Sequence, residues 1–291
     1  DGLTNHGTAS VVSYQNDMGT FPTRNYTEGQ FEGVAKITGE TMTETILKKS
    51  DTCYACTVRC KRVVEAEKDG YKVDPVYGGP EYETIGTFGS YCGIDDLEAI
   101  SYANQICNDQ GVDTISCGAT IAFAMECYEK GWLTAADTGG QELTWGNGAA
   151  IRAVVEQMIA RRGFGALLTD GVKKAAENLA PQAAEAAVHA GGQEIAYHDP
   201  RLDPGMALHA SVDPTPGRHT TGAQLYYDMY KLWMRVPGLP PSSMVYQREV
   251  RYLPGNGRTT CAVAVSNFTQ FYNSAGACYM GMLIGVDRVP I

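Results

Sequence analysis

Three cysteines, Cys53, Cys56 and Cys60, follow one another with the spacing CxxCxxxC. This spacing can direct three thiolates toward one compact metal centre, which then needs a fourth ligand. Tetrahedral zinc and iron-sulfur clusters both bind cysteine thiolates, so the spacing alone does not select between them. The motif therefore predicts a metal centre whose chemistry depends on the remaining ligand.

The rest of the sequence favours an iron-sulfur cluster over zinc or over buried thiols that cluster by chance. A zinc site usually takes its remaining ligands from a second close pair, and no later CxxC, CxxH or HxxxH occurs. A [4Fe-4S] cluster can take its fourth cysteine from a distant position. The candidates for that fourth ligand are Cys92, Cys107, Cys117, Cys127, Cys261 and Cys278. The basic residues Arg59, Lys61 and Arg62 either offset the charge of such a cluster or are ordinary solvated residues.

Composition excludes several classes of protein. Of the 291 residues, 44% are hydrophobic and 19% are charged, which is typical of a globular protein, and we expect no membrane-spanning segment. The net charge of −10 disfavours nucleic acid as a partner, because phosphate backbones are bound by clustered Lys and Arg. Nine cysteines are too few for a disulfide scaffold, and their odd number favours a reducing, cytoplasmic location.

Helical periodicity dominates after an opening of about 25 residues that reads as irregular structure. Asp95 with Glu98 resembles a capping box, and Asp113 can cap the next helix. Alternating strand patterns are scarce, so the predicted fold class is mainly α. The predicted helices cover approximately 95–111, 113–131, 151–163 and 170–179.

An Ala- and Gly-rich stretch over 181–193 predicts a linker between two packed helical domains, 1–190 and 191–291. Prolines over 198–201 and 213–219 forbid continuous helix, so loops are expected there. The sequence starts with neither an initiator Met nor a signal peptide, so we expect it to begin within a longer protein.

The order of the downstream motifs resembles the aldehyde ferredoxin oxidoreductase family. These motifs are Gly79-Pro80-Glu81-Tyr82-Glu83-Thr84, Cys92-Gly93-Ile94-Asp95-Asp96 and Asn108-Asp109-Gln110-Gly111-Val112-Asp113. In that family, two segments of the form D-x-x-G-L-D or D-x-x-G-L-C hold two pterins that chelate tungsten. In this chain, the first segment is matched by Asn108-x-x-Gly111-Val112-Asp113. The second segment is matched by Asn273-x-x-Gly276-Ala277-Cys278.

Each segment departs from the family pattern, because Asn replaces the leading Asp and Val or Ala replaces Leu. An Asn side chain still accepts one hydrogen bond while it donates others. The resemblance implies a tungsten or molybdenum bis-pterin centre. It also implies a [4Fe-4S] cluster whose ligands are Cys53, Cys56, Cys60 and Cys278, because the family's fourth cluster cysteine ends the second segment.

The resemblance also implies the residues that move protons. Glu83 best matches the family's catalytic Glu and His219 its catalytic His, with His198 as the rival and Glu81 as a neighbouring carboxylate. Tyr226, Tyr227, Tyr230 and Trp233 have helical spacing and are interpreted as core rather than as a substrate pocket.

The implied function is oxidation of an aldehyde to a carboxylic acid, with electrons passing through the cluster to ferredoxin. The alternatives are a reductase of an aromatic acyl-CoA in the same family, or a zinc-binding structural module. The family's N-terminal β-rich domain has no counterpart here, so we expect the chain to be a fragment or one subunit of a split enzyme. A homodimer is compatible with the family.

Overall fold

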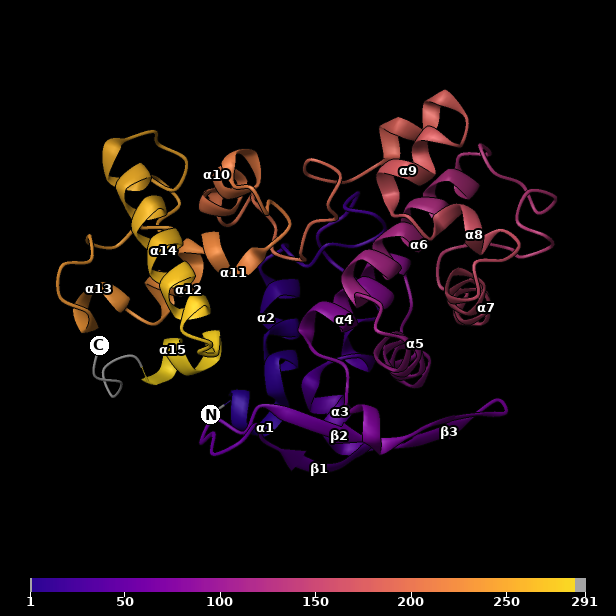
Figure 1. Cartoon of the computed structure of the whole chain (residues 1–291), viewed down its shortest axis with the longest axis horizontal. Helices are drawn as coiled ribbons and strands as arrows, with labels where there is room; N and C mark the ends of the chain where they lie inside the picture. The colour runs from indigo at the N-terminus through magenta and orange to yellow at the C-terminus, as the bar shows by residue number, and fades with distance from the viewer. Residues whose placement is uncertain (1, 286–291) are drawn as a thin grey trace. The chain divides into compact units, whose positions relative to one another are not determined.

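The computed structural model describes residues 2–285, and the chain divides into two compact units between Tyr197 and His198. The sequence places its domain boundary slightly earlier, between residues 190 and 191. The last residues of the predicted second domain, 286–291, lie outside the described residues. Each unit is mainly helical, which confirms the predicted fold class (Figure 1).

The N-terminal unit is built from helices and two small hairpins. Its α-helices are α1 (Gly2–His6), α2 (Val12–Asp17), α3 (Gly39–Thr45), α4 (Tyr82–Phe88), α5 (Leu97–Gln110), α6 (Thr114–Glu129), α7 (Gly148–Ile159), α8 (Gly165–Leu168) and α9 (Val172–Glu177). Its short 3-10 helices are η1 (Gly7–Val11), η2 (Val34–Lys36), η3 (Pro75–Tyr77), η4 (Ser90–Cys92) and η5 (Pro181–Ala186).

The hairpins are antiparallel pairs of β1 (Leu47–Asp51) with β2 (Lys61–Val64) and of β3 (Ala66–Lys68) with β4 (Tyr71–Val73). In the first hairpin, Asp51 is opposite Lys61 and Ser50 is opposite Arg62, with an irregularity between Leu47 and Lys49. These strands were not predicted from the sequence, because β1 is largely polar and only β2 has a run of buried residues.

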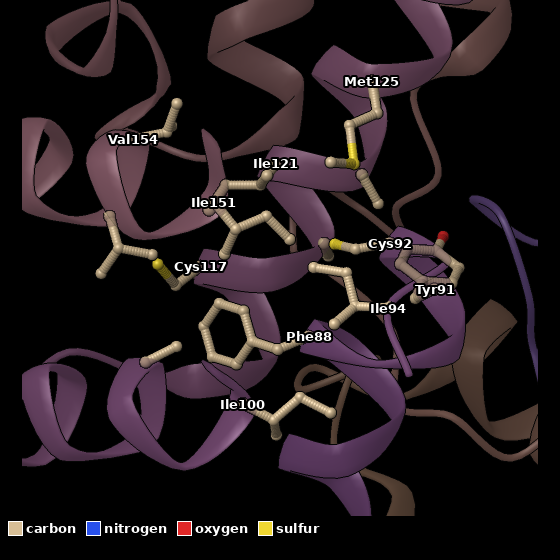
Figure 2. Packing of buried hydrophobic residues seen from close by; sticks show 14 of the residues in the cluster. Phe88, Tyr91, Cys92, Ile94, Ile100, Cys117, Ile121, Met125, Ile151 and Val154 are labelled. Carbon is tan, nitrogen blue, oxygen red and sulfur yellow. The ribbon is translucent and has the colours of Figure 1, made fainter. Parts of the chain in front are cut away.

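The core of the N-terminal unit lies among α4, α5, α6 and α7 (Figure 2). Helices α5 and α7 pack together and are both seen nearly end-on in Figure 1. Helices α4 and α6 approach closely at Gly118, where a Cβ would lie 2.2 Å from Oγ1 of Thr87. A side chain at position 118 would therefore force α4 outward, and α4 carries Glu83.

Two helix starts test the predicted caps. Asp113 is the N-cap of α6, and its Oδ2 accepts a hydrogen bond from the Ser116 backbone N–H at 2.7 Å, as predicted. The cap of α5 is Asp96, which accepts from the Ala99 N–H at 3.0 Å. The prediction of Asp95 as that cap is wrong by one residue, because Asp95 instead pairs with Lys36.

Replacing Asp96 by Ala is expected to lower the free energy of unfolding by about 1 kcal/mol, because a helix donor loses its acceptor. Replacing Asp95 by Ala is expected to cost less than about 0.5 kcal/mol, because its ion pair with Lys36 is exposed. Urea unfolding of both variants measures the difference. Equal losses would contradict the assignment of the cap.

Residues 2–17 are helical, so the prediction of irregular structure is wrong there, whereas the turns and bends over 18–25 agree with it. Helices α1 and α2 are short, and their periodicity is hidden by Gly, Asn and Thr. Burial of Leu3, Ala9 and Val12 holds these turns in place. Tertiary packing thus overrides weak local propensity in this segment.

The C-terminal unit contains α10 (Pro204–Val212), α11 (His219–Gly222), α12 (Gln224–Met229), α13 (Leu232–Arg235), α14 (Asn256–Ser274) and α15 (Tyr279–Gly285). Tyr227 and Tyr272 are buried in its core, and Tyr226, Tyr230 and Trp233 pack against it. The interpretation of these aromatic residues as core is therefore supported. No helix among residues 2–285 has the length and apolar character needed to cross a bilayer.

Candidate functional site

The CxxCxxxC motif forms the connection between β1 and β2, so a hairpin presents the three thiols. The Cys56 N–H donates to the Cys53 carbonyl at 3.1 Å, and the Thr52 hydroxyl donates to the Cys56 carbonyl at 2.6 Å. Ala55 and Arg59 have φ of 53° and 55°, which is uncommon for residues other than Gly. The loop thus adopts a tight conformation that its neighbours must stabilise.

Residues at the start of the chain supply that stabilisation. The Thr4 hydroxyl donates to the Val58 carbonyl at 3.1 Å. The buried Arg62 guanidinium donates to the Asn5 carbonyl at 2.5 Å and to the Arg59 carbonyl at 2.6 Å. A Cβ on Gly7 would lie 2.8 Å from the Cys60 carbonyl oxygen. The helical opening of the chain therefore fixes the second half of the cysteine loop.

Exposure separates the cysteines into two groups. Cys53 and Cys278 are exposed and Cys56 and Cys60 are half-buried, whereas the other five are buried: Cys92, Cys107, Cys117, Cys127 and Cys261. Burial raises the pKa of Cys92 and raises that of Cys127 to about 12, so these thiols stay protonated. Figure 2 shows Cys92 and Cys117 among apolar side chains. Metals bind the thiolate form, so the buried cysteines whose pKa is raised are poor candidates for ligands: Cys92, Cys117, Cys127 and Cys261.

A cavity of about 500 Å³ lies beside this hairpin in the N-terminal unit. Its walls come from β2, from the segment after β4, and from α4, α5 and α6. Charged and polar side chains that line it are Asp51, Lys61, Arg62, Tyr77, Glu81, Glu83, Thr84, Asn104, Asn108 and Thr114. The cavity therefore joins the base of the cysteine hairpin to Glu83 and to the first Asn-x-x-Gly segment.

Glu83 lies in the first turn of α4 and is half-buried. Its Oε2 accepts a hydrogen bond from the Tyr197 backbone N–H at 2.8 Å, and the Tyr82 hydroxyl donates to the Tyr197 carbonyl at 2.6 Å. Tyr197 is fully buried, so this carboxylate is held by a rigid neighbour. Glu81 precedes the helix, is exposed and accepts a hydrogen bond from the Thr8 hydroxyl.

The first Asn-x-x-Gly segment is the C-terminal end of α5. Gly111 has φ of 67°, its N–H donates to the Asn108 carbonyl at 3.4 Å, and the Val112 N–H donates to the Cys107 carbonyl at 2.8 Å. This is the glycine-terminated helix end in which two free carbonyls are satisfied. Asn108, Gly111, Val112 and Asp113 are all exposed there.

The second segment ends α14 in the same way. Gly276 has φ of 71°, its N–H donates to the Asn273 carbonyl at 3.0 Å, and the Ala277 N–H donates to the Tyr272 carbonyl at 3.0 Å. Cys278 follows immediately, and its carbonyl accepts from the Met282 N–H at the start of α15. Two segments matched only by sequence pattern therefore share one backbone conformation.

The two rival histidines of the C-terminal unit lie together. His219 begins α11 and is half-buried, and its ring stacks on that of the buried His198 with centroids 5.0 Å apart and planes at 17°. His198 also makes an edge contact with Tyr226 at 5.6 Å. The choice between His219 and His198 is thus a choice within one stacked pair.

A family model described as aldehyde ferredoxin oxidoreductase, domains 2 and 3, matches residues 1–289. The tungsten-containing aldehyde ferredoxin oxidoreductase of Thermococcus kodakarensis is 37% identical over 219 residues, which cover 75% of this chain. The protein of the same name from Pyrococcus furiosus is 34% identical over 219 residues. This chain belongs to the aldehyde ferredoxin oxidoreductase family. The family resemblance predicted from its motifs is confirmed.

This member of the aldehyde ferredoxin oxidoreductase family spans 35% of the length of the curated relatives that it matches. A more distant relative, the WOR-like subunit of an aliphatic sulfonate oxidoreductase from Pyrococcus furiosus, is 28% identical over 223 residues. A solved structure of the active-site complex BamBC of benzoyl coenzyme A reductase shares the fold, with a TM-score of 0.68 at 16% identity. That likeness covers 94% of this chain and 44% of the other.

Replacing Gly111 by Ala tests the helix end that this family member uses in its first segment. A Cβ there would meet nothing within 4 Å, so the cost is conformational strain at positive φ, about 1–2 kcal/mol of unfolding free energy. Replacing Gly111 by Asn is expected to cost less, because Asn tolerates this conformation. Urea unfolding compares the two variants, and an Ala variant as stable as wild type would contradict the assigned conformation.

Sequence reasoning missed several residues that shape the site. Asn104 lines the cavity one turn before Asn108 on α5, and Tyr197 holds Glu83 from a distant part of the chain. The spacing of Asn104 and Asn108 was visible in the sequence, as two amides on one face of a predicted helix. The contact between Tyr197 and Glu83 carried no local signal.

Proposed function

We propose that this chain is the cofactor- and cluster-binding part of an oxidoreductase that converts an aldehyde to a carboxylic acid at a tungsten or molybdenum bis-pterin centre. Electrons leave through a [4Fe-4S] cluster to ferredoxin. The observation that carries the proposal is the shared backbone conformation of the two Asn-x-x-Gly segments, at Gly111 and Gly276. In the family, segments of this form hold the pterins.

The residues present fit these groups. The accessible thiols are Cys53, Cys56, Cys60 and Cys278, the four that the resemblance assigns to the cluster, whereas the remaining five are buried. Two residues that line the cavity of about 500 Å³ carry buried hydrogen-bond donors with no acceptor among the described residues: Arg62 Nε and Asn104 Nδ2. Such donors suit a polar heterocycle rich in acceptors.

Aldehyde oxidation consumes one water and releases two protons and two electrons with the carboxylic acid. The bound metal would accept the electron pair, which is chemistry that no side chain supplies. Glu83 would take a proton from the attacking water, since its carboxylate lines the cavity and the Tyr197 N–H fixes its orientation. His219 would donate a hydrogen bond to the substrate carbonyl oxygen or take up its proton, and His198 would hold its ring by stacking.

Elemental and spectroscopic analysis of the full-length protein tests the proposal. We expect tungsten or molybdenum from the pterin centre. We also expect about four iron atoms and four acid-labile sulfides per chain, together with a brown colour, from the [4Fe-4S] cluster. Aldehyde-dependent reduction of ferredoxin should accompany them. A colourless protein that holds zinc would overturn the proposal in favour of the structural module. Activity with an aromatic acyl-CoA but with no aldehyde would overturn only the substrate class.

A further inference from the structure

Asn104 is a buried polar residue whose side-chain oxygen is hydrogen-bonded but whose side-chain nitrogen is not. It lies on α5 in the wall of the cavity and is 4% exposed. Its Nδ2 makes no hydrogen bond with any residue that the structure describes. A buried donor without an acceptor costs free energy, so its persistence in a folded chain points to a partner from outside the chain.

The orientation of this amide follows from its neighbour Asn108, one turn later on α5. Asn108 Nδ2 donates to the Asn104 backbone carbonyl at 2.9 Å and to Asn104 Oδ1 at 3.0 Å. A backbone carbonyl can only accept, so the Asn108 group facing it must be its NH₂. Asn104 Oδ1 is therefore the acceptor in this pair, and Asn104 Nδ2 is the donor left over. Asn108 Oδ1 is correspondingly available to accept.

We propose that Asn104 and Asn108 together bind the ring edge of one pterin, with Asn104 as a donor that the family segment does not include. A pterin ring presents a carbonyl oxygen next to N–H groups. Asn104 Nδ2 would donate to that oxygen and Asn108 Oδ1 would accept from a ring or amino N–H. The inference rests on the proposed function, and it adds a binding residue one turn before the segment.

The pair also explains how an Asn can stand where the family pattern has Asp. An Asp carboxylate only accepts hydrogen bonds, whereas Asn108 commits its donor to Asn104 and keeps an acceptor. The two neutral amides thus offer one acceptor and one donor to the ring, whereas an Asp carboxylate would offer only a charged acceptor. Because the amides are neutral, binding of a neutral ring does not require a carboxylate to lose its water.

The test compares Asn104→Asp, Asn104→Ala and Ser101→Ala in the full-length holoenzyme. Asn104→Asp keeps the acceptor for Asn108 and removes the donor, and Asn104→Ala removes both. Ser101 is the matched control, because it is buried one turn earlier on α5 and its hydroxyl is satisfied by the Leu97 carbonyl at 2.8 Å. The readout is the rate at which pterin leaves the protein, followed by the fluorescence of the oxidised ring. A second readout is the thermal midpoint of the protein stripped of cofactor.

Both Asn104 variants are expected to release pterin about 10- to 100-fold faster than wild type, whereas Ser101→Ala releases it at the wild-type rate. The midpoint of stripped Asn104→Ala should fall no further than that of stripped Ser101→Ala, because the lost acceptor for Asn108 is offset by removal of an unsatisfied buried donor. Wild-type retention in both Asn104 variants would overturn the inference and leave the proposed function standing. Faster release with a matching fall in the stripped midpoint would also overturn it, since Asn104 would then act only on the fold. A wild-type protein that never contains pterin would overturn the proposed function itself.

Discussion

Replacing Glu83 by Gln in the full-length enzyme is expected to lower kcat for aldehyde oxidation by about 10²- to 10⁴-fold, the range for loss of a general base. Gln cannot take up a proton at neutral pH, yet its amide oxygen can still accept from the Tyr197 N–H that holds Glu83. The side chain should therefore keep its place. Steady-state kinetics with a short-chain aldehyde, together with metal and iron content, measures the effect.

Glu81→Gln is the matched control, since Glu81 is the neighbouring carboxylate that lines the same cavity but is exposed and held by the Thr8 hydroxyl. Burial of its carboxyl group raises the pKa of Glu81, but the Thr8 hydroxyl already donates to that group and Glu81 lies outside α4. We therefore expect kcat for this variant within about threefold of wild type. If Glu81→Gln lost activity and Glu83→Gln kept it, the two roles would be exchanged. If neither variant changed kcat, the base would be another group.

The helices were predictable where local signals agree with packing. The apolar period of α6 and its cap Asp113 point to the same helix start, and the structure has it there. At α5 two consecutive acids, Asp95 and Asp96, both fit a cap. The choice between them depends on Lys36 and Lys68, which pair with these acids from distant segments. Sequence spacing cannot resolve a competition decided by partners that are far away along the chain.

The hairpin that carries the cysteines was not predictable by the same reasoning. Its strand β1 reads Leu-Lys-Lys-Ser-Asp and has no alternating apolar pattern, because it lies largely at the surface. The conformation of the loop depends on Arg62 and Thr4, which bond its carbonyls from outside the motif. Spacing alone could therefore identify the thiols as ligands, but the element that presents them depends on tertiary contacts.

The candidate site residues were identified mainly from the order of the motifs along the sequence. The structure adds the contacts and the backbone conformation of these residues. Glu83 was chosen by resemblance, and the Tyr197 contact now supplies a reason for its orientation. The two Asn-x-x-Gly segments depart from the family in their side chains but keep Gly at the position that needs positive φ. Their backbone requirement is thus stricter than their side-chain requirement, so the pattern was recognisable despite the substitutions. The roles of these residues and the division into domains 1–190 and 191–291 stay predictions.

Replacing Cys278 by Ala is expected to remove most of the iron and sulfide from the full-length protein and to abolish ferredoxin reduction. A cluster that is held by only three thiolates loses iron readily. No other cysteine can replace the missing ligand, because the remaining five cysteines are buried. Cys56→Ala, in the hairpin loop, should have the same effect. Iron and sulfide analysis and low-temperature electron paramagnetic resonance of the reduced protein measure the loss.

Cys261→Ala is the matched control within the same unit as Cys278. Cys261 is fully buried in α14, and burial raises its pKa to about 12, so its thiol is an apolar core group. We expect this variant to keep its full cluster and to lose about 1–2 kcal/mol of unfolding free energy through the cavity left in the core. The contrast separates ligand loss from general destabilisation. If the protein kept its iron without Cys278 and lost it without Cys261, the fourth ligand would be the buried Cys261 of α14. The family assignment of Cys278, in the connection between α14 and α15, would then be wrong.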